Sequence, residues 1–358
     1  MKAQLLRQYI SNFCYTFLIA TTISCNNQNQ SNQLKDNKSA FLKLKYTTGI
    51  RSILEDSKGN IWFGRHQEGV CLLQNGKLHY FTTKNGLSDN QVRNIYEDKN
   101  GIIWFECGRG LSTYNGKEIT RYTERDYNSK NKWKLNVNDL WFKGDQTEGY
   151  NKLEKLPGIY QYDGQKLSYR LFPVTPKSQD GFKYYISTPF IKSKNGAVWL
   201  GAYGAVIEYN GSTFKILDNE SLGLNSKTGF LHVRNIMEDN KGNIWIANNG
   251  MGVLKYDGKK AINFTEQQKL KKNDTKGNSL EKVFSIGEDN SGNIWFGTVG
   301  SGIWKYDFKS VKNFTKEDGV QSNHIWTIYK SKNGELWFGG ANPSGIYSFN
   351  GKSFERKY

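Results

Sequence analysis

The chain has 358 residues, and its 37 glycines, 5 prolines and 14% aromatic residues are typical of many short strands joined by tight turns, which excludes a membrane-spanning bundle. The formal net charge of +17 raises nucleic acid, an anionic polysaccharide or a membrane surface as a partner. Much of the charge, however, lies on turn lysines at regular spacing, namely Lys58, Lys99, Lys194, Lys241 and Lys332. We interpret this excess as solvated surface and expect no nucleic-acid binding.

The N-terminus predicts export. Residues 1–24 have a basic start and an apolar stretch that is short for a membrane span, which indicates a secretory signal peptide. The segment Thr22-Ile23-Ser24-Cys25 resembles a bacterial lipobox, although Thr22 stands where Leu is usual, and this resemblance implies lipid attachment at Cys25. Plain secretion is the alternative. Residues 25–40 are almost free of apolar side chains and predict a flexible tether, which leaves 41–358 as the folded domain.

A tryptophan within a short apolar strand recurs at intervals of 37 to 58 residues, a period that indicates propeller blades. These tryptophans are Trp62, Trp104, Trp141, Trp199, Trp245, Trp295 and Trp337. We expect each indole to fill the space between neighbouring blades, where a large aromatic surface is buried, and not to contact ligand.

Turn sequences confirm the repeat number. Six pairs of the Asn-Gly or Asp-Gly type, from Asn75-Gly76 to Asn350-Gly351, predict type I′ hairpins, and Asp307-Phe308 at the seventh place predicts another geometry. An Asp-x-x-Gly or Ser-x-x-Gly turn precedes the tryptophan strand in every repeat except the third. One carboxylate in each turn is too few for calcium, so we expect turn capping and no metal or other cofactor.

Each repeat therefore reads as four short antiparallel strands, as in residues 92–97, the Trp104 strand, 110–114 and 118–122. The predicted fold is all-β, a seven-bladed β-propeller of four-stranded antiparallel blades. Two segments compete for the last outer strand, residues 352–358 and residues 41–46. Cys71 and Cys107 are either a disulfide or buried free thiols.

The repeat resembles a known family. The sequence E-D-x-x-G-N-I-W-F-G, followed by Y-[ND]-G and G-L-x-x-N-x-V, is similar to the two-component regulator propeller, with the best matches at residues 53–98, 234–258 and 286–328. The resemblance implies the sensor part of Bacteroidota hybrid histidine kinases, here as a free-standing lipoprotein-like chain without a kinase module. It also implies a role in binding, with oligosaccharide as the expected ligand and an envelope protein as the alternative partner.

Propeller connectivity places the loops between the second and third strands, and those between blades, on one face. That face carries the variable residues and is the predicted ligand face. The candidates are Arg65, His66, Glu68, Asn90, Arg109, Trp133, Tyr184, Tyr185, Tyr203, His232, Asn248, Asn249, His324, Trp326 and Asn342. We expect Trp133, Tyr184 and Tyr185 to stack on a sugar ring while Arg65 and Arg109 pair with a carboxylate or sulfate.

Long connections at residues 123–135, 145–157, 173–190 and 265–280 predict binding loops on the same face. Two further hypotheses stand beside non-catalytic binding. One is a lyase or hydrolase similar to streptogramin lyase, with His232 or His324 as base and Glu68 as partner, which requires a histidine and a carboxylate within hydrogen-bond reach. The other is a structural subunit of an envelope complex, which requires an exposed apolar patch.

Overall fold

A computed structural model describes residues 44–358 except 46, 125–132, 137, 144–157 and 173–184. The chain divides into two units, Met1–Lys43 and Leu44–Tyr358. The predicted signal peptide and the whole predicted tether, residues 25–40 with Cys25, therefore lie outside the described residues. No helix within the described residues is long and apolar enough to cross a membrane.

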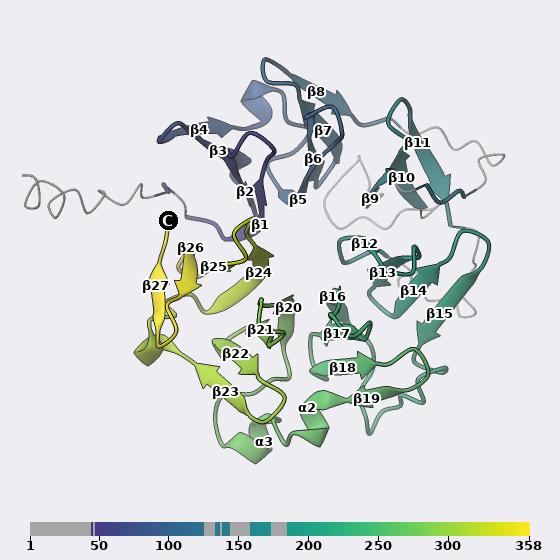
Figure 1. The fold of residues 1–358 in the computed structure, drawn as a ribbon, viewed down its shortest axis with the longest axis vertical. Helices are drawn as coiled ribbons and strands as arrows, with labels where there is room; N and C mark the ends of the chain where they lie inside the picture. Colours follow the sequence, from purple (N-terminus) through teal and green to yellow (C-terminus); the bar gives the residue numbers. More distant parts are fainter. Residues whose placement is uncertain (1–43, 46, 125–132, 137, 144–157, 173–184) are drawn as a thin grey trace, which may run out of the picture. The chain divides into compact units, whose positions relative to one another are not determined.

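Seven antiparallel sheets follow one another around a ring, which confirms the predicted propeller (Figure 1). Blade 1 contains β1 (Ile50–Glu55), β2 (Ile61–Arg65), β3 (Val70–Gln74) and β4 (Lys77–Phe81); blade 2 contains β5 (Val92–Glu97), β6 (Ile103–Cys107), β7 (Gly110–Tyr114) and β8 (Ile119–Tyr122). Blade 3 contains β9 (Leu140–Lys143), β10 (Gly158–Tyr162) and β11 (Leu167–Leu171), so within the described residues it has three strands where four were predicted.

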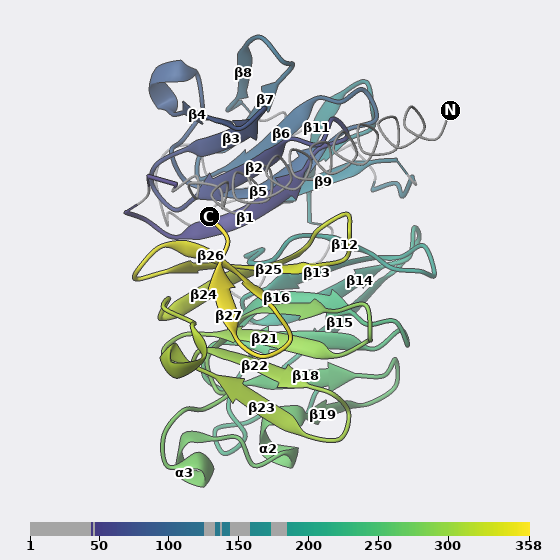
Figure 2. The ribbon, with the colours of Figure 1, turned by 60° about the vertical axis from the view of Figure 1, so that its left-hand side comes forward.

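Blades 4 to 7 each have four strands within the described residues, and their sheets lie side by side (Figure 2). Blade 4 contains β12 (Ile191–Lys192), β13 (Val198–Ala202), β14 (Ala205–Tyr209) and β15 (Phe214–Asp218); blade 5 contains β16 (Val233–Glu238), β17 (Ile244–Asn248), β18 (Val253–Tyr256) and β19 (Ala261–Asn263). Blade 6 contains β20 (Val283–Glu288), β21 (Ile294–Thr298), β22 (Ile303–Tyr306) and β23 (Val311–Phe314); blade 7 contains β24 (His324–Lys330), β25 (Leu336–Ala341), β26 (Gly345–Phe349) and β27 (Phe354–Arg356).

The first strand of a blade is the innermost strand of the ring. Strands β1, β5, β16, β20 and β24 surround the central opening in Figure 1, and β1 contacts both β5 and β24. Blade 1 therefore packs directly against blade 7, which closes the ring. The C-terminal segment supplies β27 as the outer strand of blade 7, while Leu44 is buried against Trp337 without joining a strand. This settles which of the two competing segments forms that strand.

The seven repeated tryptophans form the core between blades, as predicted, and none is more than 5% exposed. Trp62 of blade 1, for example, packs with Val92, Ile95 and Phe105 of blade 2. Burial of such an indole stabilises the contact between two sheets by several kcal/mol, on the order of 3–5 by comparison with truncation to alanine. Each blade is thereby tied to its neighbour.

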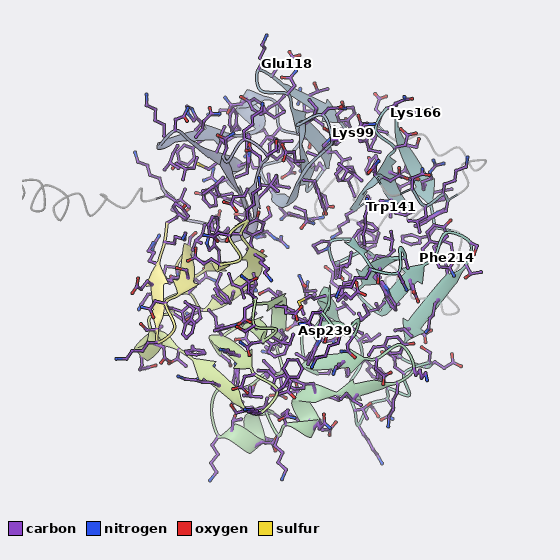
Figure 3. All side chains as sticks on the ribbon, viewed as in Figure 1. Lys99, Glu118, Trp141, Lys166, Phe214 and Asp239 are labelled. Atoms are coloured by element: carbon purple, nitrogen blue, oxygen red, sulfur yellow. The ribbon has the colours of Figure 1, made fainter. Side chains whose placement is uncertain are left out.

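The aspartate of the Asp-x-x-Gly turn has a second role besides capping. Asp239, labelled in Figure 3, accepts hydrogen bonds from the Lys241 and Asn243 backbone N–H groups at 2.9 and 2.8 Å, and from Trp245 Nε1 at 2.9 Å. The same indole contact is made by Asp56, Asp98 and Asp289. We call this arrangement the Asp–Trp clamp. In blade 3, where the turn is missing, Trp141 Nε1 is buried without a hydrogen-bond partner.

The hairpin prediction is right at Asn75-Gly76, where both residues have positive φ, and wrong elsewhere. The other six connections between third and fourth strands have four residues, of which only the second has positive φ. The first side chain shapes the wider loop by accepting backbone hydrogen bonds, as Asp257 does from Lys259 and Lys260. Phe308 adopts this same geometry with φ 67°, contrary to the prediction of a different turn.

Two further sequence predictions meet the structure here. Cys71 and Cys107 are buried free thiols, so the disulfide alternative does not hold. The segment 265–280 is not a loop without structure, because it contains α2 (Phe264–Gln267) and α3 (Lys272–Thr275), and Phe264 and Leu280 at its two ends are buried in the core between blades 5 and 6.

Candidate functional site

The inner strands of five blades share a β-bulge near their first residues. The pairing of the first with the second strand shifts across Arg51, Arg93, Arg234, Phe284 and Trp326 in blades 1, 2, 5, 6 and 7 respectively. Each shift lies at the strand end that faces the loops between second and third strands, since Ile50 pairs with Arg65 and Val92 with Cys107. A bulge re-aims a side chain at the cost of local pairing, and bulges are frequent next to functional sites.

All five bulge residues line one cavity of about 250 Å³. Because they come from innermost strands on opposite sides of the ring, the cavity lies in the central channel, toward the predicted ligand face. His66, Glu106, Lys143, Thr188 and Asn235 also line it. Blades 1, 2, 3, 4, 5, 6 and 7 therefore each contribute to its wall.

Trp326 is the centre of one half of this wall. The Arg51 guanidinium carbon lies 4.9 Å from the Trp326 ring centroid, and the rings of His66 and His324 each lie 4.7 Å from it in edge-on geometry. Arg51 Nη1 also donates to His66 Nδ1 at 3.3 Å. The contacts join blades 1 and 7 across the closure of the ring.

The other half of the wall is built around Arg234. Its guanidinium carbon lies 4.9 Å from the Phe284 ring centroid and 5.2 Å from that of Tyr203. Phe284 in turn contacts His324 at 4.4 Å, and Tyr203 contacts His232 at 5.3 Å. Rings and guanidinium groups thus form a continuous belt through blades 1, 7, 6, 5 and 4.

Burial and nearby arginines lower the pKa values of two histidines of the belt. Burial, together with the positive charges of Arg51 and Arg93, lowers the pKa of His66 to about 4. Burial and the charges of Arg51 and Arg234 lower the pKa of His324 to about 3. At neutral pH the positive charge of the belt therefore resides on its arginines.

One carboxylate lies among these cations. Glu106 accepts a hydrogen bond from Asn94 Nδ2 at 2.8 Å through Oε1, and from the Lys143 backbone N–H at 2.9 Å through Oε2. Burial and the charge of Arg93 hold the pKa of Lys143 well below its usual range, while Glu106 acts in the opposite direction. The Glu106 carboxylate therefore connects strands β5 and β9 through these two hydrogen bonds.

Of the residues predicted from sequence, only His66 and Trp326 line the cavity, with Tyr203, His232 and His324 directly behind it. Tyr184 lies outside the described residues, and Tyr185 accepts a backbone hydrogen bond from Tyr203 at 2.9 Å. Arg109 and Asn342 are exposed, Arg109 Nε lying 3.3 Å from Asp89 Oδ2. Asn249 donates its backbone N–H to His232 O at 3.0 Å.

The remaining candidates hold the scaffold together. Arg65 is 3% exposed and pairs with Glu68, whose oxygens also accept hydrogen bonds from Thr47 and Thr48. Trp133 packs against Trp141, Tyr209, Phe172 and Phe214 and donates Nε1–H to Leu171 O at 2.7 Å. Asn248 is buried and accepts from the His232 backbone N–H, and Asn90 accepts from the Thr83 N–H.

Sequence reasoning missed Arg51, Arg93, Arg234 and Phe284, although a signal for them exists. In all five bulged strands two apolar residues of the core are three positions apart, as in Val92 and Ile95, whereas a regular strand repeats every two; both are buried except in blade 7, where Ile328 is partly buried. The segments I-R-S-I, V-R-N-I, V-R-N-I, V-F-S-I and I-W-T-I show this spacing.

The enzyme and structural-subunit hypotheses each required a particular feature. Within the described residues no histidine nitrogen lies within 4.0 Å of a carboxylate oxygen, and Glu68 is held by Thr47, Thr48 and Arg65. The large apolar side chains exposed in this part of the chain are Phe230 and Phe308, on opposite ends of their blades. The required pair of a histidine and a carboxylate is therefore not found among the described residues.

The fold and its central cavity define a seven-bladed β-propeller with a polar, arginine-rich channel. Five segments, residues 47–64, 86–105, 230–250, 279–300 and 319–342, match the family described as Two component regulator propeller. The chain thus contains repeats of this family. The matched segments cover the first two strands of blades 1, 2, 5, 6 and 7, which are the blades that carry the bulge.

Solved structures share the fold. Two extracellular domains of putative hybrid two component systems from B. thetaiotaomicron, each 19% identical, have TM-scores of 0.65 and 0.56. The matches cover 88% and 85% of this chain but only 40% and 38% of those chains, so this chain spans about two fifths of their length. A streptogramin B lyase is 15% identical with a TM-score of 0.55, over 82% of this chain and 92% of that one. No curated protein matches the sequence.

Proposed function

We propose that this chain is a non-catalytic, sensor-like binding propeller of the bacterial cell envelope, which holds a small ligand, an oligosaccharide, in the central channel. The observation that carries the proposal is the repeated bulge, which brings one side chain from each of five blades, three arginines, a phenylalanine and a tryptophan, to one shared cavity. A repeat that conserves its fold while varying the residue at one position builds a specific site on a rigid scaffold.

Two considerations support binding without turnover. The histidines of the belt contact rings and guanidinium groups, and their lowered pKa values make them poor proton carriers near neutral pH. The family also supports a sensor-like role, since the similar solved structures are extracellular domains of putative hybrid two component systems. The lyase alternative rests on a shared fold alone.

The binding test is a calorimetric titration of the full-length chain with a panel of neutral and acidic oligosaccharides. Each sugar is recovered afterwards and analysed by mass spectrometry. We expect at least one sugar to bind with a dissociation constant below about 1 mM and to be recovered unchanged. Recovery of a cleaved or eliminated sugar would establish catalysis and overturn the proposal.

Envelope attachment has its own test. Expression in a bacterium supplied with a labelled fatty acid should label the chain, and the Cys25→Ala variant should lose the label while the protein is still exported. A labelled Cys25→Ala variant, or an unlabelled wild-type chain, would contradict lipid attachment at this residue. A Cys14→Ala variant, altered in the predicted signal peptide, is the matched control.

A further inference from the structure

The lining of the central cavity is strongly unbalanced in charge. Three of its side chains are arginines, Arg51, Arg93 and Arg234, a fourth basic residue is Lys143, whose pKa burial holds low, and one residue, Glu106, is acidic. Glu106 offsets at most one of the three arginine charges, and its oxygens accept hydrogen bonds from Asn94 and the Lys143 backbone. Arginine guanidinium groups gathered in a partly enclosed cavity favour carboxylate, sulfate or phosphate groups, which they can bind with two parallel hydrogen bonds.

Arg234 gives the most direct indication of a ligand. Its guanidinium lies between the rings of Phe284 and Tyr203, and its Nε is buried without a hydrogen-bond partner. Within the described residues no carboxylate oxygen lies within 4.0 Å of it. A buried donor that has lost its water costs stability unless a partner arrives, so this group calls for an acceptor from outside the protein.

Trp326 supplies a second donor of the same kind. It lines the cavity, and its Nε1–H is buried without a hydrogen-bond partner. An indole N–H donates and cannot accept, so its natural partner is an oxygen atom. A charged guanidinium and an indole, on different blades, thus both present unsatisfied donors to one cavity.

The ring order fixes how the charges are arranged. Arg51 and Arg93 come from the neighbouring blades 1 and 2, whereas Arg234 comes from blade 5, with blades 3 and 4 between them on one side and blades 6 and 7 on the other. The arginines thus face the cavity from two sides. A ligand with one anionic group toward each side can contact both sets of guanidinium groups at once.

We propose that the central cavity binds a small ligand with at least two anionic groups, one held by Arg51 and Arg93 and the other by Arg234, with Trp326 donating a hydrogen bond to the ligand. This inference rests on the proposed binding function and adds the charge of the ligand to it. Carboxylate and sulfate groups share the chemistry that the site recognises, so the experiment treats them as separate arms.

The experiment is calorimetric titration of the full-length chain with matched pairs of probes. The carboxylate arm compares trigalacturonic acid with its neutral methyl ester, and the sulfate arm compares a disulfated galactose disaccharide with the unsulfated sugar. Citrate is the arm without a sugar. We expect one charged member to bind at least tenfold more tightly than its neutral partner, and higher salt to weaken that binding.

Three variants locate the binding. Arg234→Gln should weaken the charged probe at least tenfold, Arg234→Lys should restore part of the loss, and Arg121→Gln, on the exposed outer strand of blade 2, should leave affinity unchanged. Thermal unfolding of each variant verifies that it is folded. If Arg234→Gln does not fold, the affinity of Arg234→Lys for the charged probe still tests the role of this residue.

The outcomes separate the two proposals. Equal binding of charged and neutral sugars, with no effect of Arg234→Gln, would overturn the anionic ligand and leave the binding function in place. Binding of citrate alone would support the anionic ligand and replace the oligosaccharide. Absence of binding by every probe would overturn both.

Discussion

The seven blades fall into two groups, blades 1, 2, 5, 6 and 7 on the one hand and blades 3 and 4 on the other. The groups differ in their inner strand and in how the core tryptophan is held. The first group matches the family repeat, carries the bulge and, except in blade 7, fastens its tryptophan with the Asp–Trp clamp. In blade 7 Trp337 Nε1 bonds Glu335 at 2.9 Å instead. Blade 3 leaves Trp141 Nε1 without a partner, and in blade 4 the inner strand β12 has two residues.

The difference shows that the repeat contains two separate structural features, one at each end of the blade. At one end of the blade an aspartate fixes the core, and at the other a bulge presents a side chain to the channel. The tryptophan alone is sufficient for a blade, since Trp141 and Trp199 are as buried as the others. The clamp adds stability, and the bulge adds the site.

The largest effect is expected from removing a clamp. Asp239→Ala leaves the Trp245 indole and two backbone N–H groups without their acceptor, and should lower the free energy of unfolding by about 3 kcal/mol. Urea unfolding measures this. Asp257→Ala, in the exposed turn of the same blade, is the control and should have a much smaller effect. Equal effects would show that the clamp is only a turn cap.

The next effect compares two tryptophans. Trp245→Phe removes both ring volume and the hydrogen bond to Asp239, whereas Trp141→Phe removes ring volume and a donor that has no partner. We expect Trp245→Phe to cost about 1–2 kcal/mol more in the free energy of unfolding. If Trp141→Phe proved equally costly, the distinction between clamped and unclamped blades would fail.

A smaller effect lies within a regular blade. Phe308 has φ 67° where the corresponding turn of blade 5 has Gly258, and positive φ is costly for a bulky side chain. Phe308→Gly should raise the free energy of unfolding by about 1 kcal/mol. The gain is reduced by the energy of the lost contact between the Phe308 ring and Lys241 Nζ, which lies 4.1 Å from the ring centroid. Gly258→Phe should have the opposite sign. The thermal midpoints of the two variants, each compared with the unmodified chain, measure these two changes in stability.

The smallest effect concerns pH. The lowered pKa values of His66 and His324 mean that the unfolded chain binds more protons than the folded one below about pH 6.5. Stability contributed by these groups is therefore complete above pH 6.5 and is lost as pH falls toward 4 and 3. Arg51→Gln should raise both pKa values toward 6.5 and flatten this dependence. NMR titration of the imidazoles checks it; unchanged values would show that burial alone sets them.

Much of the fold could be predicted from sequence because its signals are local. A tryptophan such as Trp62 marks every blade, and turns of the Asp56 and Asn75 types recur in most of them. His66 and Trp326, which line the central cavity, were also among the residues predicted for one face of the ring. Arg51, Arg93 and Arg234 were not, because a bulge shifts a side chain into the channel that strict strand alternation would place elsewhere. The packing of Trp133 against Phe172 and Phe214 could not be predicted because these neighbours come from segments distant in sequence.

The central claim is that the bulges of the regular blades form the binding site. Hydrogen exchange of the backbone amides, with and without saturating amounts of the tightest-binding acidic probe, tests it most directly. The account predicts slower exchange at the first residues of β1, β5, β16, β20 and β24, and no change in the turns of Asp56, Asp98, Asp239 and Asp289. Protection confined to those turns, or to the outer strands, would contradict it.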